Sequence, residues 1–413
     1  MDTQNTLNAA PLDAAAAAKA AFAAVEGLPF PDDIFIAPEL RWAVIGCGVI
    51  ANQMAQSLAL AGRKVYGVAN RTLEKAEAFA TEYGVERVYR SVEELYADPA
   101  VDAIYITTPH NTHIEYLRGA LAAGKHVLCE KAITLNSDEL AEARAIADEH
   151  HVVLMDATTV LHMPLYVELM RRVREGEFGR LRLAQVNFGS FHDYEDMQNR
   201  FWNRSLAGGA MLDIGVYALS VARLFMESQP NEVVSLANLF KTGVDEESGF
   251  ITRNAQGQLG VFSLTMHAKQ PKRADLCFDN CYVEIMAYPR ADRATITWTA
   301  DGRREEVTAG VEAYALCYEI ADLEKAVAED ESKLKLIDYA SDVMETMTRL
   351  RRDWGVVPRR SSGGMRCSHG LPHGLSLVLK GASGTSSCFE QRPREQSEHI
   401  DKYRYVVQTD RCI

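Results

Sequence analysis

Three separate segments of this chain carry side chains that can hold or move a proton. One contains His110 and His113, the next contains Lys131, and the third contains Asp213 and Tyr217. The third segment has a helical pattern, and residues four apart share one face of a helix, so its aspartate and tyrosine should lie side by side. A tyrosine, a lysine and a carboxylate are suited to general acid–base chemistry on a hydroxyl or carbonyl group.

A glycine-rich turn precedes these segments. It follows an apolar run, opens a helical pattern and reads Gly46-Cys47-Gly48-Val49-Ile50-Ala51. The first glycine permits a tight turn, the second lets backbone N–H groups approach a pyrophosphate, and the small alanine lets helix and strand pack closely. The N-terminus of the helix adds partial positive charge. In this strand–turn–helix context the motif predicts a dinucleotide site that includes Val49 and Ile50.

The second apolar run ends in Ala69-Asn70-Arg71. An NAD-selective fold would place Asp or Glu there, whereas Arg71 offers a planar guanidinium that can bind a 2′-phosphate. With Asn70 and Arg71 as cofactor-binding residues, the sequence favours NADP, and NAD stays possible.

Short apolar runs alternate with amphipathic stretches over residues 40–156. The runs are Trp42–Ile45, Lys64–Ala69, Ala103–Thr107, His126–Cys129 and Val152–Met155. Helical patterns lie between them at Leu73–Tyr83, Ile114–Ala123 and Asp138–His150. Buried strands that alternate with helices predict an α/β Rossmann domain with a mostly parallel sheet.

Residues 157–357 follow a different pattern. Helical segments at about Met163–Glu175 and Gly209–Phe225 are followed by strands whose sidedness alternates, and helices return at Glu312–Ala328 and Ile337–Arg352. This predicts an α+β domain with a largely antiparallel open sheet. Helices cover one face of such a sheet, so the other face should form a homodimer or homotetramer interface.

The two ends of the chain lie outside this pattern. Residues 1–39 form an N-terminal extension whose Ala-rich stretch, Asp13–Val25, predicts a short helix. Residues 358–413 are basic and rich in Ser and Gly without helical periodicity, which is typical of a disordered or non-native tail.

The composition excludes several classes of function. The 413 residues carry a net charge of -13, which does not favour nucleic-acid binding. A membrane span is not expected, because no run of about 18 apolar residues occurs. The start of the chain lacks a secretory signal pattern, and the eight cysteines form no CxxC pair, so we expect a cytoplasmic protein with free thiols and no metal site.

The glycine turn, Glu130-Lys131 and the segment Gly208-Gly209…Asp213…Gly215…Tyr217 together resemble the Gfo/Idh/MocA oxidoreductase family over about residues 40–355. The resemblance is to the family's Glu-Lys-Pro and Gly-Gly-x-x-x-Asp-x-Gly-x-His/Tyr motifs. A tyrosine at the last position resembles the dihydrodiol and sugar dehydrogenase branch, which is often NADP-linked. The resemblance therefore implies hydride transfer between a nicotinamide and a sugar, polyol or vicinal diol.

Two positions depart from the family pattern: Ala132, and Asp156, which precedes Ala157 where many relatives have Glu-Ala. Ala132 stands where the motif has proline, and a trans peptide bond is expected before alanine. We expect Tyr217 to be the general acid/base and Lys131 to lower its pKa and to bind the reacting oxygen. Asp213 would orient a second substrate hydroxyl.

Further residues are expected to surround the nicotinamide, because ligands bind beyond the carboxyl ends of strands in open α/β sheets. These cofactor-binding candidates are Thr108, Pro109, His110, His113, Glu130 and Lys131. Two alternatives remain: an NAD-retaining glycosidase of the same fold, and a non-enzymatic nucleotide or sugar sensor. Retention of both Lys131 and Tyr217 disfavours the sensor, which needs no proton transfer.

Overall fold

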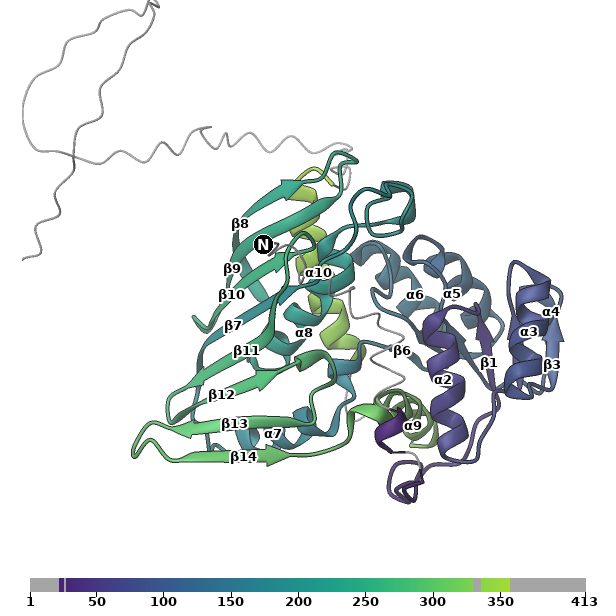
Figure 1. Cartoon of the computed structure of the whole chain (residues 1–413), viewed down its shortest axis with the longest axis horizontal. Helices are drawn as coiled ribbons and strands as arrows, with labels where there is room; N and C mark the ends of the chain where they lie inside the picture. Colours follow the sequence, from purple (N-terminus) through teal and green to yellow (C-terminus); the bar gives the residue numbers. More distant parts are fainter. Residues whose placement is uncertain (1–21, 26, 330–335, 357–413) are drawn as a thin grey trace, which may run out of the picture. The chain divides into compact units, whose positions relative to one another are not determined.

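The first half of the chain builds a six-stranded parallel sheet in the order β3-β2-β1-β4-β5-β6. Its edge strands β3 and β6 lie on either side of β1 in Figure 1. The structure is a computed structural model that describes residues 22–25, 27–329 and 336–356. The strands are β1 (Trp42–Ile45), β2 (Gly67–Ala69), β3 (Arg87–Tyr89), β4 (Ala103–Ile106), β5 (His126–Cys129) and β6 (Leu154–Asp156). This order and the helices between the strands define a Rossmann fold, as predicted.

Helices connect these strands. They are α2 (Val49–Leu60), α3 (Leu73–Tyr83), α4 (Val92–Ala97), η1 (His110–Thr112), α5 (His113–Ala122) and α6 (Ser137–Glu149). Strands β1 and β4 are buried along their whole length. Parallel strands covered on both faces have continuous apolar sequences, which explains why the bounds of β1 and β5 were predicted to the residue. The bounds of α3 were also predicted to the residue, from its helical pattern.

The second half forms an eight-stranded sheet in the order β14-β13-β12-β11-β7-β10-β9-β8. Its strands are β7 (Leu181–Gly189), β8 (Pro230–Leu239), β9 (Asp245–Asn254), β10 (Leu259–Thr265), β11 (Gln270–Phe278), β12 (Cys281–Met286), β13 (Arg293–Trp298) and β14 (Arg304–Thr308). All neighbouring pairs are antiparallel except β7 and β10, which are parallel. The expected largely antiparallel sheet is confirmed.

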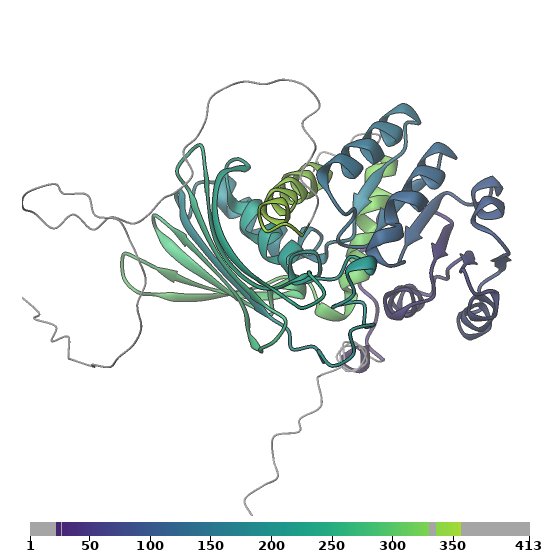
Figure 2. The ribbon, with the colours of Figure 1, turned by 90° about the horizontal axis from the view of Figure 1, so that it is seen from above.

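The two faces of this sheet differ. On β10, Phe262 and Leu264 are buried, whereas Ser263 between them is exposed. The helices lie on one face only (Figure 2). Exposed aliphatic side chains occupy the other face where β8 pairs with β9, with Val234 opposite Ile251.

The remaining helices position the two halves against each other. They are η2 (Thr159–Leu161), α7 (Pro164–Arg174), η3 (Arg204–Leu206), η4 (Met211–Gly215), α8 (Val216–Phe225), η5 (Tyr288–Arg290), η6 (Glu312–Tyr314), α9 (Ala315–Ala328) and α10 (Leu336–Asp353). Glu324 on α9 accepts a hydrogen bond of 2.9 Å from the indole of Trp42 on β1.

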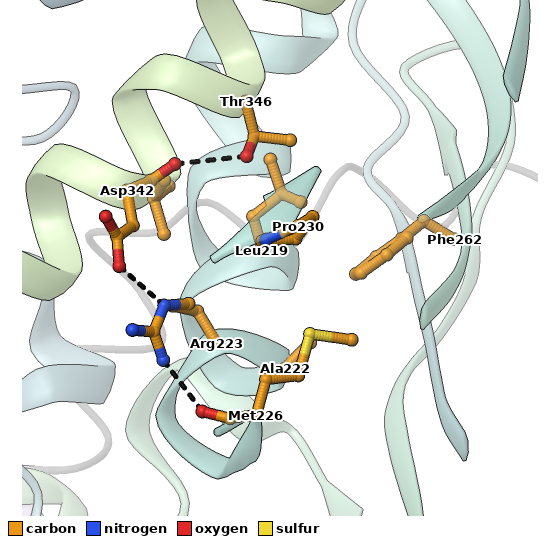
Figure 3. A pocket seen from close by; sticks show the side chains of 9 residues that line it. Leu219, Ala222, Arg223, Met226, Pro230, Phe262, Asp342 and Thr346 are labelled. Atoms are coloured by element: carbon orange, nitrogen blue, oxygen red, sulfur yellow. Dashed lines mark hydrogen bonds and ion pairs between the residues drawn. The ribbon is translucent and has the colours of Figure 1, made fainter. Parts of the chain in front are cut away.

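Helix α10 contacts both halves. Its Asp338 accepts from Arg144 on α6 at 2.7 Å, and its Asp342 accepts from Arg223 on α8 at 2.7 Å. Figure 3 shows this second contact at the edge of a small pocket between α8 and α10, where Arg223 also donates to the carbonyl of Met226. The helix that carries the third chemical segment is therefore fixed to the Rossmann half.

One helical stretch, Arg204–Phe225, is long and apolar enough to cross a membrane by length and composition. Of its most apolar window, 78% is buried inside the protein, as in a core helix. The expected Asp13–Val25 helix lies mostly outside the described residues, although Phe22–Ala24 is helical. Residues 358–413 lie wholly outside them.

Candidate active site

The turn after β1 forms an open cradle at the start of α2. Gly46 has φ +105°, and a Cβ there would lie 2.7 Å from Oγ1 of Thr107. A Cβ on Gly48 would meet nothing within 4 Å, and no side chain caps α2, whose first turn contains no acidic residue. Val49 is exposed beside these groups, and Ala51 is fully buried. Free N–H groups facing open space fit a dinucleotide pyrophosphate.

The end of β2 presents the cation expected there. Asn70 donates its side-chain amide to the carbonyl of Thr72 at 2.9 Å, which holds the turn. Arg71 is exposed and forms no ion pair with any of the described residues. Its guanidinium therefore remains available to a phosphate group.

The loop after β4 brings two histidines against the Glu130-Lys131 segment. Nε2 of His110 lies 2.9 Å from the carbonyl oxygen of Lys131, and a carbonyl only accepts, so this nitrogen donates. Burial, with smaller contributions from His113 and Lys131, lowers the pKa of His110 to about 3. His110 is therefore neutral, and it lines a pocket together with the exposed Pro109.

His113 is fully buried, and its ring nitrogens lie 3.0 and 2.7 Å from the carbonyl oxygens of Ala132 and Thr108. Neither nitrogen faces solvent, so this residue connects the two loops. The side chain of Thr108 accepts a hydrogen bond of 2.9 Å from Thr112.

The three catalytic candidates lie together. Nζ of Lys131 is 3.1 Å from Oδ1 of Asp213 and 2.8 Å from the carbonyl oxygen of the same residue. It also lies 4.8 Å from the centroid of the Tyr217 ring. The arrangement joins β5 of the Rossmann half to the helix of the second half. An ammonium, a carboxylate and a phenol in one cluster can orient and transfer a hydroxyl proton.

The charge states of this cluster follow from burial and from its partners. Burial disfavours the charged forms of both Lys131 and Asp213, but the attraction between the two charges is stronger than this effect. Asp213 raises the pKa of Lys131, and Lys131 together with Arg200 lowers the pKa of Asp213. Both are therefore ionised at neutral pH. Burial raises the pKa of Tyr217, and the opposing effect of Lys131 is smaller. The expected lowering by Lys131 is therefore present, but the larger effect of burial makes the net shift upward, and the sequence does not show how deeply the ring is buried.

Glu130 lies behind this cluster. It accepts hydrogen bonds from the hydroxyl of Tyr105 and, at 3.2 Å, from the backbone N–H of Lys131. Burial raises its pKa. These contacts fix the strand end that carries the lysine.

The Lys131–Ala132 peptide bond is cis. The expected trans bond is therefore wrong at this position. The local preference is overridden by tertiary contacts, because His110 binds the carbonyl group of Lys131 and His113 lies against that of Ala132.

Asp245, at the start of β9, is a residue that sequence reasoning missed. Its Oδ2 accepts a 2.6 Å hydrogen bond from the backbone N–H of Met211, the first residue of η4. Gly209 has φ +122°, and a Cβ there would lie 2.4 Å from Oδ1 of Asp245. The glycine thus lets a buried carboxylate reach the start of the helical segment that bears Asp213.

That segment begins as a π-helix, η4, and continues as α8. The sequence pattern predicted a regular helix from Gly209. A Cβ on Gly215 would lie 2.6 Å from Sδ of Met211, so the close packing of this turn depends on the glycine. π-Turns inside helices occur frequently at functional sites.

The loop between β7 and η3 supplies further pocket residues. Nη1 of Arg200 lies 3.6 Å and Nε2 of His192 lies 4.0 Å from the Asp213 carboxylate. The pocket has about 270 Å³ of empty space and is lined by Pro109, His110, Arg200, Phe201, Leu206, Ala207, Gly208, Gly209 and Asp213. Neither Arg200 nor His192 was among the site residues predicted from the sequence.

Fold and site together define a dinucleotide-binding oxidoreductase with a second, substrate-facing half. Residues 40–158 match the oxidoreductase family with the NAD-binding Rossmann fold, and residues 166–285 match the GFO/IDH/MocA C-terminal domain. The chain belongs to the Gfo/Idh/MocA oxidoreductase family, as its motifs predicted, and is an NAD(P)-dependent oxidoreductase of that type.

Curated relatives include trans-1,2-dihydrobenzene-1,2-diol dehydrogenases. The protein from Mus musculus is 34% identical over 239 residues, which cover 57% of this chain and 71% of the relative. The protein from Xenopus tropicalis is 31% identical over 59% of this chain and 74% of the relative.

Solved structures share the fold. A 3-ketoreductase from Actinomadura kijaniata, in complex with TDP-benzene and NADP, has a TM-score of 0.63 at 23% identity and covers 75% of this chain and 96% of its own. A levoglucosan dehydrogenase in complex with NADH and levoglucosan has a TM-score of 0.69 at 20% identity, with the same coverage.

Proposed function

We propose that this protein is an NADP-linked dehydrogenase or reductase that acts on a secondary alcohol or carbonyl of a sugar, polyol or vicinal diol. The observation that carries this proposal is the Lys131–Asp213–Tyr217 cluster, in which Nζ of the lysine lies 3.1 Å from the carboxylate and 4.8 Å from the ring centroid. The names of the curated relatives and of the solved structures support the substrate class.

The residues that would hold the cofactor are those of the cradle and its surroundings. Gly46, Gly48, Val49 and Ile50 would contact the pyrophosphate, with Asn70 and Arg71 at the 2′-phosphate. Thr108, Pro109, His110 and Glu130 would lie along the nicotinamide side, where His113 fixes the loop. When bound, the nicotinamide supplies the hydride acceptor, so alcohol oxidation yields a carbonyl compound, reduced cofactor and one proton.

The chain's own residues handle the proton. In the oxidation, the phenolate of Tyr217 accepts the hydroxyl proton, and the Lys131 ammonium stabilises negative charge on the reacting oxygen. In the reduction, the neutral phenol donates that proton. Asp213 holds the ammonium and accepts a hydrogen bond from a second hydroxyl of the substrate.

A pH dependence follows from the tyrosine. Burial raises the pKa of Tyr217, so at neutral pH most of the enzyme carries the neutral phenol. The oxidation rate should therefore rise as the pH increases, whereas the reduction rate should be highest on the neutral side and fall at alkaline pH.

The direct test is to mix the purified protein with NADP or NAD and a panel of aldoses, polyols and vicinal diols, and to follow the absorbance of the reduced nicotinamide. We expect signal with at least one polyhydroxy substrate and a lower KM for NADP than for NAD. Tight cofactor binding without signal on the whole panel would contradict the proposal. Release of a sugar from glycosides under those conditions would favour the NAD-retaining glycosidase.

We also propose a homodimer or homotetramer built on the open face of the second sheet. Val234 and Leu236 on β8 are 75% and 83% exposed, and Ile251 on the paired strand is also exposed. Such neighbouring aliphatic side chains suit a partner surface. Sedimentation that shows only monomer at micromolar concentration would refute this, as would an unchanged oligomer in a Leu236→Asp variant.

We propose a cytoplasmic location, supported by five described cysteines that are all free thiols. Fractionation that places the protein in an oxidising compartment would contradict this.

A further inference from the structure

Two cations, Lys131 and Arg200, lie around the single carboxylate of Asp213. Asp213 is ionised, and the ammonium of Lys131, 3.1 Å away, already balances it. The guanidinium of Arg200 lies farther from the same carboxylate, at 3.6 Å. Because one carboxylate can neutralise only one of these cations, the second positive charge is in excess.

The side chain of Arg200 is positioned to bind a ligand. Its guanidinium lies 4.1 Å from the centroid of the Phe201 ring, and its side chain is 53% exposed in the wall of the pocket. Its one ion pair among the described residues is the long contact with Asp213, and exposed pairs of this kind contribute little. A planar guanidinium stacked on a ring is a preferred partner for carboxylate and phosphate groups.

Lys272, on β11, is a second cation, and the Glu312 carboxylate interacts with it electrostatically without forming an ion pair. Its ammonium lies 4.8 Å from the centroid of Phe188, whose ring is 6.1 Å from that of Tyr217. Within the described part of the chain it forms no ion pair. Burial lowers its pKa and Glu312 opposes this shift, whereas Arg290 and Lys131 lower the pKa further and Asp213 raises it.

The neighbouring residue shows the contrast. Arg273 is paired at 2.9 Å with Asp275 and at 2.9 Å with Glu284. The register of β11 against β7 shifts between Gln270 and Arg273, so Lys272 sits at an irregular point of the strand. Irregularities of this type re-aim side chains next to active sites.

His192 provides a third polar group without a partner. Its ring stacks on Phe201 at 3.6 Å between centroids, and its buried Nε2 has no hydrogen-bond partner in the described structure. This nitrogen lies 4.0 Å from the Asp213 carboxylate, beyond hydrogen-bond distance. An unpaired buried polar atom is costly unless a ligand or water satisfies it.

We propose that the alcohol substrate of this site carries an anionic group, a carboxylate or a phosphoryl group, which Arg200 and Lys272 bind. This inference rests on the proposed function and specifies its substrate class as anionic polyhydroxy compounds. The phosphates of the cofactor have a separate cradle at Gly48 and Arg71, so they do not account for these two cations. The anion neutralises the excess charge, and the reacting hydroxyl is thereby oriented toward Tyr217.

The experiment compares matched sugars that differ only at C6, where the anionic sugar carries its charged group. D-glucose is set against D-glucuronate and glucose 6-phosphate, and D-galactose against D-galacturonate, so that the carboxylate and phosphoryl arms are separate. Each sugar is titrated calorimetrically into the protein with NADP, and kcat/KM is measured where turnover occurs. The variants are Arg200→Gln and Lys272→Gln. The matched control is Arg182→Gln, at an exposed arginine on β7 that is paired with Asp279. Melting curves verify that each variant is folded.

We expect an anionic sugar to bind at least tenfold more tightly than its neutral counterpart. Each pocket variant should lower that ratio roughly 10- to 100-fold, because it loses a charge-assisted hydrogen bond to the anion. Where turnover occurs, the change should appear mainly in the KM for the anionic sugar. The Arg182→Gln control should leave the ratio unchanged. The preference should weaken with added salt.

Two results would overturn the proposal. In one, no anionic sugar binds better than its neutral counterpart in either series. In the other, both pocket variants keep the wild-type ratio. Turnover of neutral sugars without any anion preference would refute this inference and leave the proposed function standing. Anion-selective binding that depends on Arg200, without turnover, would support the anion site and count against the dehydrogenase function.

Discussion

The two ligand sites that we propose for this protein would recognise their ligands by different means. The cofactor half presents mainly backbone groups, from a glycine turn and an uncapped helix N-terminus, together with the exposed side chain of Arg71. All of these lie within the local sequence around β1 and β2. The proposed substrate site uses side chains that come from distant segments of both halves, such as Lys131, Asp213 and Lys272. Backbone recognition therefore depends on local conformation, and side-chain recognition depends on how the second sheet is placed.

This difference has a mechanistic consequence. A dinucleotide cradle of backbone N–H groups accepts the same ligand in many proteins, because it reads phosphates. A pocket of side chains can be changed one residue at a time without loss of the cofactor site. Substitutions in one of these sites should thus leave the ligand affinity of the other site nearly unaffected.

The largest expected effect is that of Lys131→Met. Loss of the ammonium removes stabilisation of the reacting oxygen and leaves the Asp213 carboxylate without its closest cation, so kcat should fall by roughly 10²- to 10⁴-fold. NADP affinity, measured by fluorescence titration, should stay within a few fold. Lys241→Met, at a lysine that lies over Phe240, is the control. A kcat within tenfold of wild type would show that the cluster is not the reaction centre.

Arg71→Gln should act on the cofactor half alone. Because the guanidinium has no ion pair with the described residues, its removal should raise the KM for NADP roughly 10- to 100-fold and leave the KM for NAD nearly constant. Steady-state kinetics with both cofactors measure this, with the exposed Arg90→Gln as the control. Equal effects on NADP and NAD would mean that Arg71 does not read the 2′-phosphate.

Asp245→Asn should have a smaller effect that depends on pH. Burial raises the pKa of Asp245 to about 6, so above this pH the ionised carboxylate accepts the Met211 N–H and positions η4. At pH 8 we expect kcat to fall by roughly 3- to 10-fold with little change in KM. At pH 5 both side chains are neutral, and the variant should resemble the wild type. The same loss at both pH values would mean that the charge has no role.

The smallest effect concerns stability at the junction of the halves. Nδ1 of His162 lies 2.8 Å from Oδ2 of Asp322 on α9; burial opposes its protonation, but this carboxylate prevails and raises its pKa to about 9. Its contribution to the free energy of unfolding is therefore complete below an unfolded pKa of about 6.5 and is lost as the pH rises through 9. His162→Asn should flatten the fall in Tm between these pH values by a few degrees. An unchanged slope would exclude this pair as its source.

The same division explains what the sequence could predict. In the cofactor half, apolar runs and glycines predicted β1, β5, α3 and the turn at Gly46, because these features depend on nearby residues. In the substrate half, helical spacing predicted that Asp213 and Tyr217 lie together, and the structure places them around one ammonium.

Tertiary packing decides the features that the sequence did not predict. The cis bond before Ala132 coincides with histidine contacts to both neighbouring carbonyls. Asp245, which contacts the start of the π-turn at η4, lies on a strand beyond the helix. Arg200 is one of several charged residues in a polar loop. No periodic pattern in the sequence indicates that its side chain is oriented toward Asp213. The raised pKa of Tyr217 likewise depends on burial by residues distant in the chain.

The most direct test of the account is the rate of nicotinamide reduction by Tyr217→Phe compared with the wild type, on the best substrate of the panel and at saturating NADP. The substitution removes the hydroxyl and retains the ring that lies against Lys131 and Phe188. We predict a loss of roughly 10²- to 10⁴-fold in kcat, with NADP affinity and Tm nearly unchanged. A variant that keeps the wild-type rate would show that Tyr217 does not transfer the proton and would contradict the proposed mechanism.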